Sequence, residues 1–393
     1  MVAHGLRRDL HAVHHRLADN DDDREWALEL GSMLPTLTRS HGPMLHIALL
    51  AAVLASQPMT AEAARSQIVS EEVTFVAGGR TIPGTLVHPE SGTGPGLLLL
   101  AGSGPTDRDW NSPLLPGKNG SARLLAEALA ARGVTVLRFD KAFSGKNPGL
   151  PIADLTLDTY RDEASAALDF LRSRAEVDPA RVFVAGHSEG GIHATRLAES
   201  RGDRIRGVIL ISAPGRSLRE ILEVQLEKNI LGSAKMTPEQ VEAEMAPVRA
   251  ALRSFVAGQD VDPKSASSNP QIVAILSALM SPMVARIGRE LASFEPAQAA
   301  AGIAAPVLVM QGGKDVQVDP VEDAGRLVTA RRSARKAVDY HLSPLADHVL
   351  KTEPRSLEEV RANLQLLTTA YNAPDRTLAD DLVEALAKWI RDH

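Results

Sequence analysis

Residues 186–190 read Gly-His-Ser-Glu-Gly and follow a short apolar run, RVFVAG, that is typical of a buried strand. A helical pattern begins directly afterwards, so this G-x-S-x-G sequence falls at a strand-to-helix turn. Bulky side chains two residues before or after the serine would collide in so sharp a turn, whereas glycines fit. Such a turn presents the serine hydroxyl above a sheet and aims a helix N-terminus at it. We weigh a glycine-rich turn without chemistry against this interpretation and predict that Ser188 is a nucleophile.

A serine hydroxyl needs a histidine base, and the base needs an acid that orients it. At a turn of this kind the acid and then the histidine follow the serine along the chain. Asp315 ends the Gly-Gly-Lys-Asp sequence after the apolar run Val307–Gln311, so we predict that it is the acid. Asp319 is the alternative acid, but it precedes Pro320 as a helix N-cap should.

Three histidines follow Asp315 in the chain. His341 falls inside the last predicted strand and His393 is the final residue, whereas His348 lies in the loop after that strand. We therefore predict that His348 is the base. We expect its neighbour Asp347 to be solvated and to play no part in the chemistry.

The negative charge that develops on a substrate oxygen would need two backbone N–H donors. The first is expected from Glu189, the residue after the nucleophile. The second is expected from the loop Ala-Gly-Ser-Gly-Pro at 101–105, where small residues allow close approach. We favour Ser103, with Gly102 or Gly104 as alternatives. A phosphate-binding loop is excluded there, because neither a P-loop nor a dinucleotide-binding pattern follows.

Apolar runs and helical periodicity alternate from about residue 70 onward. Strands are predicted at Glu71–Ala77, Thr81–His88, Gly96–Leu100, Val134–Phe139, Arg181–Gly186, Val208–Ser212, Val307–Gln311 and Ala337–Leu342. Helices are predicted at 121–132, 157–175, 190–200, 320–331 and 377–391. This alternation indicates an α/β fold with a mostly parallel twisted sheet flanked by helices. Residues 216–300 show only helical patterns, which suggests a helical cap inserted near the carboxyl edge of the sheet, where ligands bind.

Three motifs resemble those of bacterial α/β-hydrolase esterases, the group described as serine aminopeptidase S33-like or dienelactone-hydrolase-like. They are GSGPTDRD at 102–109, RFDK at 138–141 and GHSEGG at 186–191. The resemblance spans roughly residues 70–391 and implies an α/β-hydrolase fold and hydrolysis. In similar esterases the first motif supplies the oxyanion hole and the second ends the fourth strand. The resemblance does not name a substrate, and the helical block varies among such proteins.

The leading hypothesis is hydrolysis of a small-molecule carboxylic ester through an acyl-enzyme. An S33-type peptidase or a thioesterase would use the same residues, and a non-catalytic binding protein of this fold is a further alternative. An aminopeptidase should bind a substrate ammonium group with carboxylates of the cap. The glutamates of that block are spaced as on solvated helix faces; they are Glu220, Glu223, Glu227, Glu239, Glu242 and Glu244.

Composition bears on the other classes of function and on the location of the protein. The chain of 393 residues carries a formal charge of −6 and lacks cysteine, which argues against nucleic-acid binding and excludes disulfides and thiolate sites. No metal or organic cofactor is implied. Within the extension 1–63, a positive flank after Met33, a short apolar run and Ala-Glu-Ala at 61–63 resemble a secretory signal peptide. The run is too short to span a membrane. We expect a hydrolase domain over 64–393 that is periplasmic or secreted, with a cytoplasmic location as the alternative.

Overall fold

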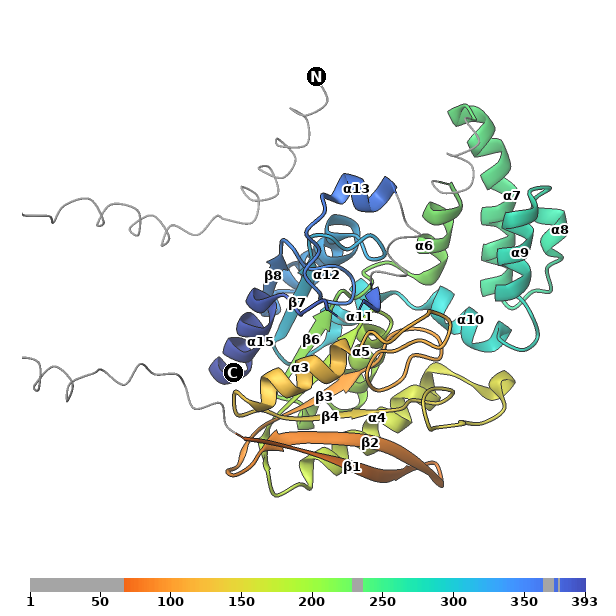
Figure 1. Cartoon of the computed structure of the whole chain (residues 1–393). Coiled ribbons are helices and arrows are strands. Elements are labelled where there is room, and N and C mark those ends of the chain that lie inside the picture. The colour runs from red at the N-terminus through yellow and green to blue at the C-terminus, as the bar shows by residue number, and fades with distance from the viewer. Residues whose placement is uncertain (1–66, 228–235, 363–370, 374) are drawn as a thin grey trace, which may run out of the picture. The chain divides into compact units, whose positions relative to one another are not determined.

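The computed structural model describes residues 67–227, 236–362, 371–373 and 375–393 (Figure 1). The extension and signal peptide predicted within residues 1–63 lie outside this part of the chain. No helix within the described part is long and apolar enough to cross a bilayer.

Eight strands form one sheet in the order β1-β2-β4-β3-β5-β6-β7-β8. Their bounds are β1 Ile68–Ala77, β2 Arg80–Pro89, β3 Gly94–Leu100, β4 Thr135–Phe139, β5 Val177–His187, β6 Gly207–Ile211, β7 Val307–Gly312 and β8 Val338–Ser343. β2 pairs antiparallel with both β1 and β4, and every other pair is parallel. This order and the single antiparallel strand inside the sheet are those of the predicted α/β-hydrolase fold.

The central strands β3 and β6 carry only apolar residues and glycine or proline, as expected where helices cover both faces of a sheet. In β3, Leu98 and Leu100 pack into one core layer and Leu97 and Leu99 into the other. The first layer is covered by α4 (Leu157–Arg172), α5 (Gly190–Arg201), α11 (Pro296–Gly302) and α12 (Gly325–Ser333), and the second by α3 (Ser121–Ala130) and α15 (Asp380–Asp392). Parallel strands direct their carboxyl ends to one edge, where the predicted site residues follow β3, β5, β7 and β8.

The helix predicted at 320–331 begins differently from the expectation. Pro320–Ala324 forms one wide π-helical turn, and regular α-helix follows in α12. The turn places the Asp323 carboxylate in the interior, where it is fully buried and pairs with Arg216 at 2.6 Å. A periodic sequence pattern does not reveal this widening, because the buried ion pair is made with a residue 107 positions away.

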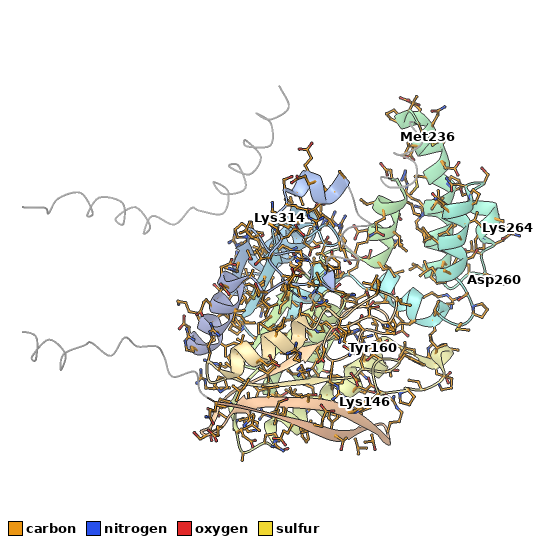
Figure 2. The ribbon with its side chains drawn as sticks, viewed as in Figure 1. Lys146, Tyr160, Met236, Asp260, Lys264 and Lys314 are labelled. Carbon is orange, nitrogen blue, oxygen red and sulfur yellow. The ribbon has the colours of Figure 1, made fainter. Side chains whose placement is uncertain are left out.

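Helices also fill the chain between β6 and β7, and we call the described part of 216–300 the helical block. Apart from α11, its helices are α6 Leu218–Gln225, α7 Pro238–Val256, α8 Pro263–Ala266, α9 Pro270–Leu279 and α10 Ala285–Ser293. Figure 2 labels Met236, Asp260 and Lys264 on this block, away from Tyr160 of α4. The block has a small apolar core of its own, formed by Leu226, Met245, Val248, Ala251, Leu252, Ala266, Ile272 and Leu276.

Candidate active site

Ser188 lies at the turn between β5 and α5 in a strained backbone conformation. Its φ is +54°, in the left-handed region that side chains other than glycine rarely adopt. A Cβ at Gly186 would lie 2.0 Å from the Gly190 carbonyl oxygen, and one at Gly190 would lie 2.5 Å from the Leu100 carbonyl oxygen. Both flanking positions therefore need glycine for the steric reason inferred from the sequence.

The structure brings Asp315 and His348 together. His348 Nδ1 lies 2.9 Å from Asp315 Oδ2, which leaves Nε2 as the basic nitrogen. The other Asp315 oxygen, Oδ1, accepts the backbone N–H groups of Gln317 at 2.8 Å and Val318 at 3.0 Å. Gln311 donates to Oδ2 from 3.1 Å, so the carboxylate is held from several sides.

The pKa values of this pair move in opposite directions. Burial by itself would raise the pKa of Asp315, but the charge of His348 and its hydrogen bond outweigh burial and lower the pKa. For His348, burial would lower the pKa, whereas the charge and hydrogen bond of Asp315 raise it above the usual value. The pair therefore favours a protonated imidazole beside an ionised carboxylate, the state that a base reaches after it accepts a proton.

Ser188 and His348 line the same cavity, whose volume is about 280 Å³. Among the hydrogen bonds of the described residues there is none between the Ser188 hydroxyl and His348, although such bonds are often long without substrate. The remaining lining residues are Gly102, Ser103, Gly104, Pro105, Thr106, Trp110, Ser112, Leu114, Leu115, Asn119, His187, Gln317, Val349, Tyr371 and Asn372.

The predicted oxyanion loop lies directly against the nucleophile. A Cβ at Gly102 would be 3.2 Å from Ser188 Cβ and 3.3 Å from the His187 carbonyl oxygen. Ser103 lines the cavity, and its carbonyl accepts a 2.7 Å hydrogen bond from the Thr106 hydroxyl. Glu189, the other predicted donor, is the N-cap residue of α5, where backbone N–H groups are free of intrahelical partners. Both predicted donors therefore border Ser188.

The remaining candidates occupy other positions. Asp319 accepts the N–H groups of Val321 at 2.8 Å and Glu322 at 3.0 Å, so it caps the turn as predicted. His341 lies inside β8, also as predicted. The expectation that Asp347 is solvated is wrong, because Asp347 is fully buried and pairs with Arg376 at 2.7 Å. Its partner is 29 positions away, so the local sequence gave no sign of this pairing.

Two of the recognised motifs bind each other, which the sequence reasoning missed. Arg108 of GSGPTDRD pairs with Asp140 of RFDK at 2.8 Å, and Asp109 pairs with Arg138. The Arg108 and Arg138 side chains and that of Asp140 are almost completely buried. The opposite charges in the two motifs could have suggested this pairing. The crossed ion pairs fix the loop after β3 to the end of β4.

His187, the variable residue between Gly186 and Ser188, also supports the site. Burial and the charge of His348 lower the pKa of His187 to about 3, so the ring is neutral near pH 7. Its Nε2 lies 2.7 Å from the His348 carbonyl oxygen and donates to it, and its ring stacks on Trp110 at 4.3 Å. His187 therefore connects the nucleophile turn to the loop that carries His348.

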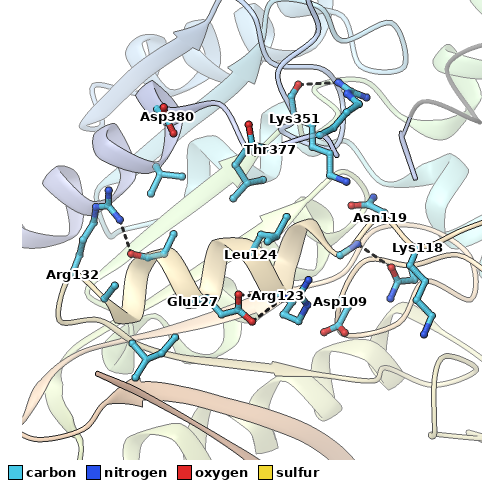
Figure 3. Close-up of a pocket in the computed structure, with 18 of the residues that line it drawn as sticks. Asp109, Lys118, Asn119, Arg123, Leu124, Glu127, Arg132, Lys351, Thr377 and Asp380 are labelled. Carbon is cyan, nitrogen blue, oxygen red and sulfur yellow. Dashed lines mark hydrogen bonds and ion pairs between the residues drawn. The ribbon is translucent and has the colours of Figure 1, made fainter. Parts of the chain in front are cut away.

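A larger groove lies beside α3 and lacks the predicted site residues. Its volume is about 1120 Å³, and it runs between α3 and the segment 376–384 (Figure 3). Arg123 pairs with Glu127 and Arg132 with Glu384 along its wall. This groove is mixed in charge, and neither Ser188 nor His348 lines it.

One group among the described residues has the geometry to hold a metal ion. It consists of Glu71, His88 and Glu176, at the end of the sheet where β1 and β2 pair. The guanidinium of Arg174 already pairs with Glu71 at 2.7 Å and with Glu176 at 3.1 Å. These contacts describe an ion-pair network, and none of its residues lines the cavity at Ser188.

Parts of the chain are similar in sequence to known proteins. The chain is 33% identical to Esterase EstD of Thermotoga maritima over 159 residues. This match covers 40% of this chain and 36% of the relative. It is 30% identical over 102 residues to the quorum-quenching protein AidA of Acinetobacter baumannii, covering 25% of this chain and 33% of the relative. The matches thus span about a third of the length of these curated relatives.

Solved structures are similar at lower identity. The structure of a DcsB complex with its substrate analogue has a TM-score of 0.49 and 14% identity, and covers 82% of this chain and 99% of that chain. Proline iminopeptidase of Mycobacterium smegmatis has a TM-score of 0.46 and 20% identity, covering 77% and 99%. The family model described as serine aminopeptidase, S33 (Hydrolase_4) matches residues 118–355, more than half of the chain. The chain therefore belongs to this family of α/β-hydrolases.

Proposed function

We propose that the chain hydrolyses small, uncharged carboxylic esters through an acyl-enzyme on Ser188. The observation that carries this proposal is one cavity of about 280 Å³ lined by Ser188, His348 and Ser103. Ligand pockets usually have volumes of about 300–1,000 Å³, so this cavity suits a small substrate. A distant relative named as an esterase also supports the proposal.

The lining of the cavity favours an uncharged substrate. Apart from its two histidines, the described lining residues include no acidic or basic side chain. An aminopeptidase would need a carboxylate to hold the substrate ammonium group, because a buried unpaired charge is costly. The glutamates of the helical block do not line the cavity, and several of them pair with arginines, for example Glu223 with Arg219 at 3.0 Å and Glu220 with Arg326 at 2.9 Å. An ester therefore fits better than an aminoacyl peptide.

The reaction follows from the roles of five residues. Ser188 Oγ attacks the ester carbonyl while His348 Nε2 takes its proton, and Asp315 stabilises the resulting imidazolium. The N–H groups of Ser103 and Glu189 stabilise the tetrahedral oxyanion. The imidazolium protonates the departing alcohol, which leaves an acyl-serine. A water molecule, deprotonated by His348, then releases the acid and restores Ser188.

A matched pair of substrate series tests this proposal. We expect p-nitrophenyl esters with short acyl chains to be cleaved and aminoacyl-p-nitroanilides to be left intact. Ser188→Ala should fold with an unchanged thermal melt and lose about 10⁴-fold or more in kcat, since triad residues act as a unit. Substantial esterase activity in folded Ser188→Ala would refute the assignment, and preferred cleavage of the anilides would favour a peptidase.

Acyl thioesters belong in the same experiment. A thioesterase would use the same residues, and none of the described lining residues distinguishes oxygen from sulfur in the leaving group. A kcat/KM for short acyl thioesters that exceeds the value for the matching oxygen esters by tenfold would reassign the substrate class while keeping the proposed residues.

A further inference from the structure

Lys141, the last residue of the RFDK motif, is a buried cation beside the predicted oxyanion loop. Its residue is 4% exposed, and its ammonium donates to the carbonyl oxygen of Gly104. We propose that Lys141 is a positioning residue that, together with Thr106, holds the oxyanion loop in its working conformation. This inference rests on the proposed function, because it assigns a task to groups behind the proposed oxyanion hole.

The surroundings of Lys141 make a purely structural role costly. The Nζ atom lies 4.8 Å from the centre of the Tyr160 ring, and burial lowers the pKa of Lys141 although the charges of Glu189 and Glu163 partly oppose this. Its hydrogen bond to Gly104 is the one such bond that the described residues give it. Burying an ammonium group costs free energy that methionine at this position would avoid. The buried charge of Lys141 is therefore best explained by its hydrogen bond to the Gly104 carbonyl, which restrains the loop.

Two successive carbonyl groups of the loop are held by side chains. Thr106 Oγ1 donates to the Ser103 carbonyl at 2.7 Å, and Lys141 donates to the next carbonyl, that of Gly104. In a trans peptide the C=O and the following N–H point in opposite directions, so each bond fixes a peptide plane. The plane after Gly104 has no N–H because Pro105 follows. Lys141 thus orients backbone there and does not compete for an oxyanion donor.

Glycine makes this restraint necessary. Gly104 has a φ of +66°, and a glycine can leave such a conformation more easily than any other residue. On the other side of Ser103, Gly102 lies close to Ser188 and His187, so that side is restrained by packing. Without Lys141 and Thr106, the part of the loop beyond Ser103 would be free to rotate. The Gly104 N–H, the alternative donor, shares a peptide plane with the Ser103 carbonyl that Thr106 holds, and rotation there would also let Ser103 and its own N–H shift.

The charge of Lys141 also acts on Glu189, the residue that carries the second proposed donor. The Glu189 carboxylate lies 3.4 Å from His193 Nε2. Burial would raise its pKa, but the hydrogen bond and charge of His193, together with the charge of Lys141, lower it. Glu189 is the residue whose backbone N–H is the other predicted donor. One buried cation therefore acts on both segments that carry the donors, the loop after β3 and the start of α5.

Kinetics of Lys141→Met in the full chain test this role, with Lys146→Met as the matched control. Lys146 lies five residues further on, its side chain is 75% exposed, and it pairs with Glu72 at the surface (Figure 2). We expect Lys141→Met to lose about 10- to 100-fold in kcat with a KM within about threefold of the parent, since misplacing one donor weakens only the transition state. Lys146→Met should match the parent protein.

A trifluoromethyl ketone supplies a readout that loss of stability alone would not change. Its carbonyl carbon bonds to Ser188 Oγ, the carbonyl electron pair moves to oxygen, and the serine proton passes to His348, which produces a stable oxyanion. The inhibition constant should weaken in Lys141→Met by the same factor as kcat/KM. If folded Lys141→Met keeps kcat, or loses kcat while it still binds the ketone as tightly as the parent, the proposal is overturned.

Thr106→Val keeps the proposal testable if Lys141→Met does not fold. The Thr106 hydroxyl is exposed, so its removal should leave the melt unchanged, and we expect kcat to fall about three- to tenfold with a matching loss of ketone affinity. An unchanged kcat in that variant would overturn the proposal. Ser188→Ala separates the two hypotheses, because an inactive Ser188→Ala beside an unaffected Lys141→Met leaves the proposed function intact.

Discussion

The loop between β3 and α3, residues 101–120, and the helical block between β6 and β7 are both long excursions from the sheet, but they are stabilised differently. The loop is irregular and is held by buried polar contacts such as Arg108–Asp140 and Lys141–Gly104. The block is helical, has its own apolar core and carries ion pairs at its surface, for example Arg249–Glu242. Polar contacts therefore stabilise the loop, whereas apolar packing stabilises the helical block.

The two regions also differ in how close they lie to the proposed active site. Ten of the cavity-lining residues come from the loop, and none of the described residues of the block lines the cavity. A helix satisfies its own backbone groups, whereas an irregular loop beside a substrate must have its N–H and C=O groups held by other parts of the protein. We therefore expect substitutions at the edge loops to change catalysis or selectivity, and substitutions in the block to change stability alone. The cap role expected for the block stays a prediction.

The largest effect is expected at the loop after β7. Asp315→Asn keeps the shape of the side chain but removes the charge that orients His348, so kcat should fall by up to about 10⁴-fold. Asp319→Ala, four residues on, removes only a helix cap and should cost roughly 0.5–2 kcal/mol of stability with little change in kcat. Steady-state kinetics and thermal melts of both variants measure this contrast. The reverse pattern would require the two assignments to be exchanged.

The same pair predicts a pH dependence. Neutral His348 is the active base, and Asp315 raises its pKa above the usual value of about 6.5, so kcat/KM should rise with pH and reach half its maximum above that value. Removing the charge in Asp315→Asn should move this acid limb to lower pH. A limb that stays in place would mean that the observed titration belongs to another group.

Breaking a buried link between the motifs should have the next largest effect. Arg108→Met leaves the Asp140 carboxylate, which is 2% exposed, without its guanidinium partner, so the free energy of unfolding should fall by about 3–5 kcal/mol. Urea denaturation followed by circular dichroism measures the change. Removing both charges, in Arg108→Met with Asp140→Leu, should recover part of the loss. A single variant that is as stable as the parent would show that the crossed ion pairs do not anchor the loop.

Selectivity for acyl length should respond to the loop and not to the block. Leu115 lines the cavity, so Leu115→Ala enlarges it and should improve kcat/KM for longer acyl chains relative to acetate by roughly tenfold, the value of one or two methylene groups. Leu279→Ala, in α9 against the core of the block, is the matched control and should leave the preference unchanged. A p-nitrophenyl ester series measures both. A shift in Leu279→Ala alone would give the block a role in the site.

The sequence was sufficient to predict the strands, the flanking helices and the fold, because alternating apolar runs and helical periodicity are local signals. It also identified Ser188, Asp315 and His348, whose proposed roles remain to be tested, from a turn motif and from their order along the chain. It did not reveal the burial of Asp347, because its partner Arg376 is distant along the chain. It did not reveal Lys141 either, since a lysine after a strand usually reaches solvent.

The sequence also did not predict which residues line the cavity. Tyr371 and Asn372 line the cavity although they lie far from every motif, and only the tertiary structure brings them to Ser188. The helical block was expected near the site because it follows β6 in the chain. Proximity in the order of strands does not determine which side chains reach a cavity, because that depends on how the helices pack.

The smallest effect is expected at the surface of the block, where the comparison with the loop is sharpest. Arg249 pairs with Glu242 and lies 3.7 Å from Glu227, and the two glutamate side chains are 66% and 50% exposed. Water and salt screen such pairs, so Arg249→Ala should lower the free energy of unfolding by less than about 1 kcal/mol, and by less still at high salt. The ester series should be unchanged, because no described residue of the block lines the cavity. Measuring denaturation at low and high salt beside the kinetics checks both expectations. Two results would contradict the comparison between the loop and the helical block. One is a loss of unfolding free energy as large as that of Arg108→Met, and the other is a change in kcat/KM for the esters.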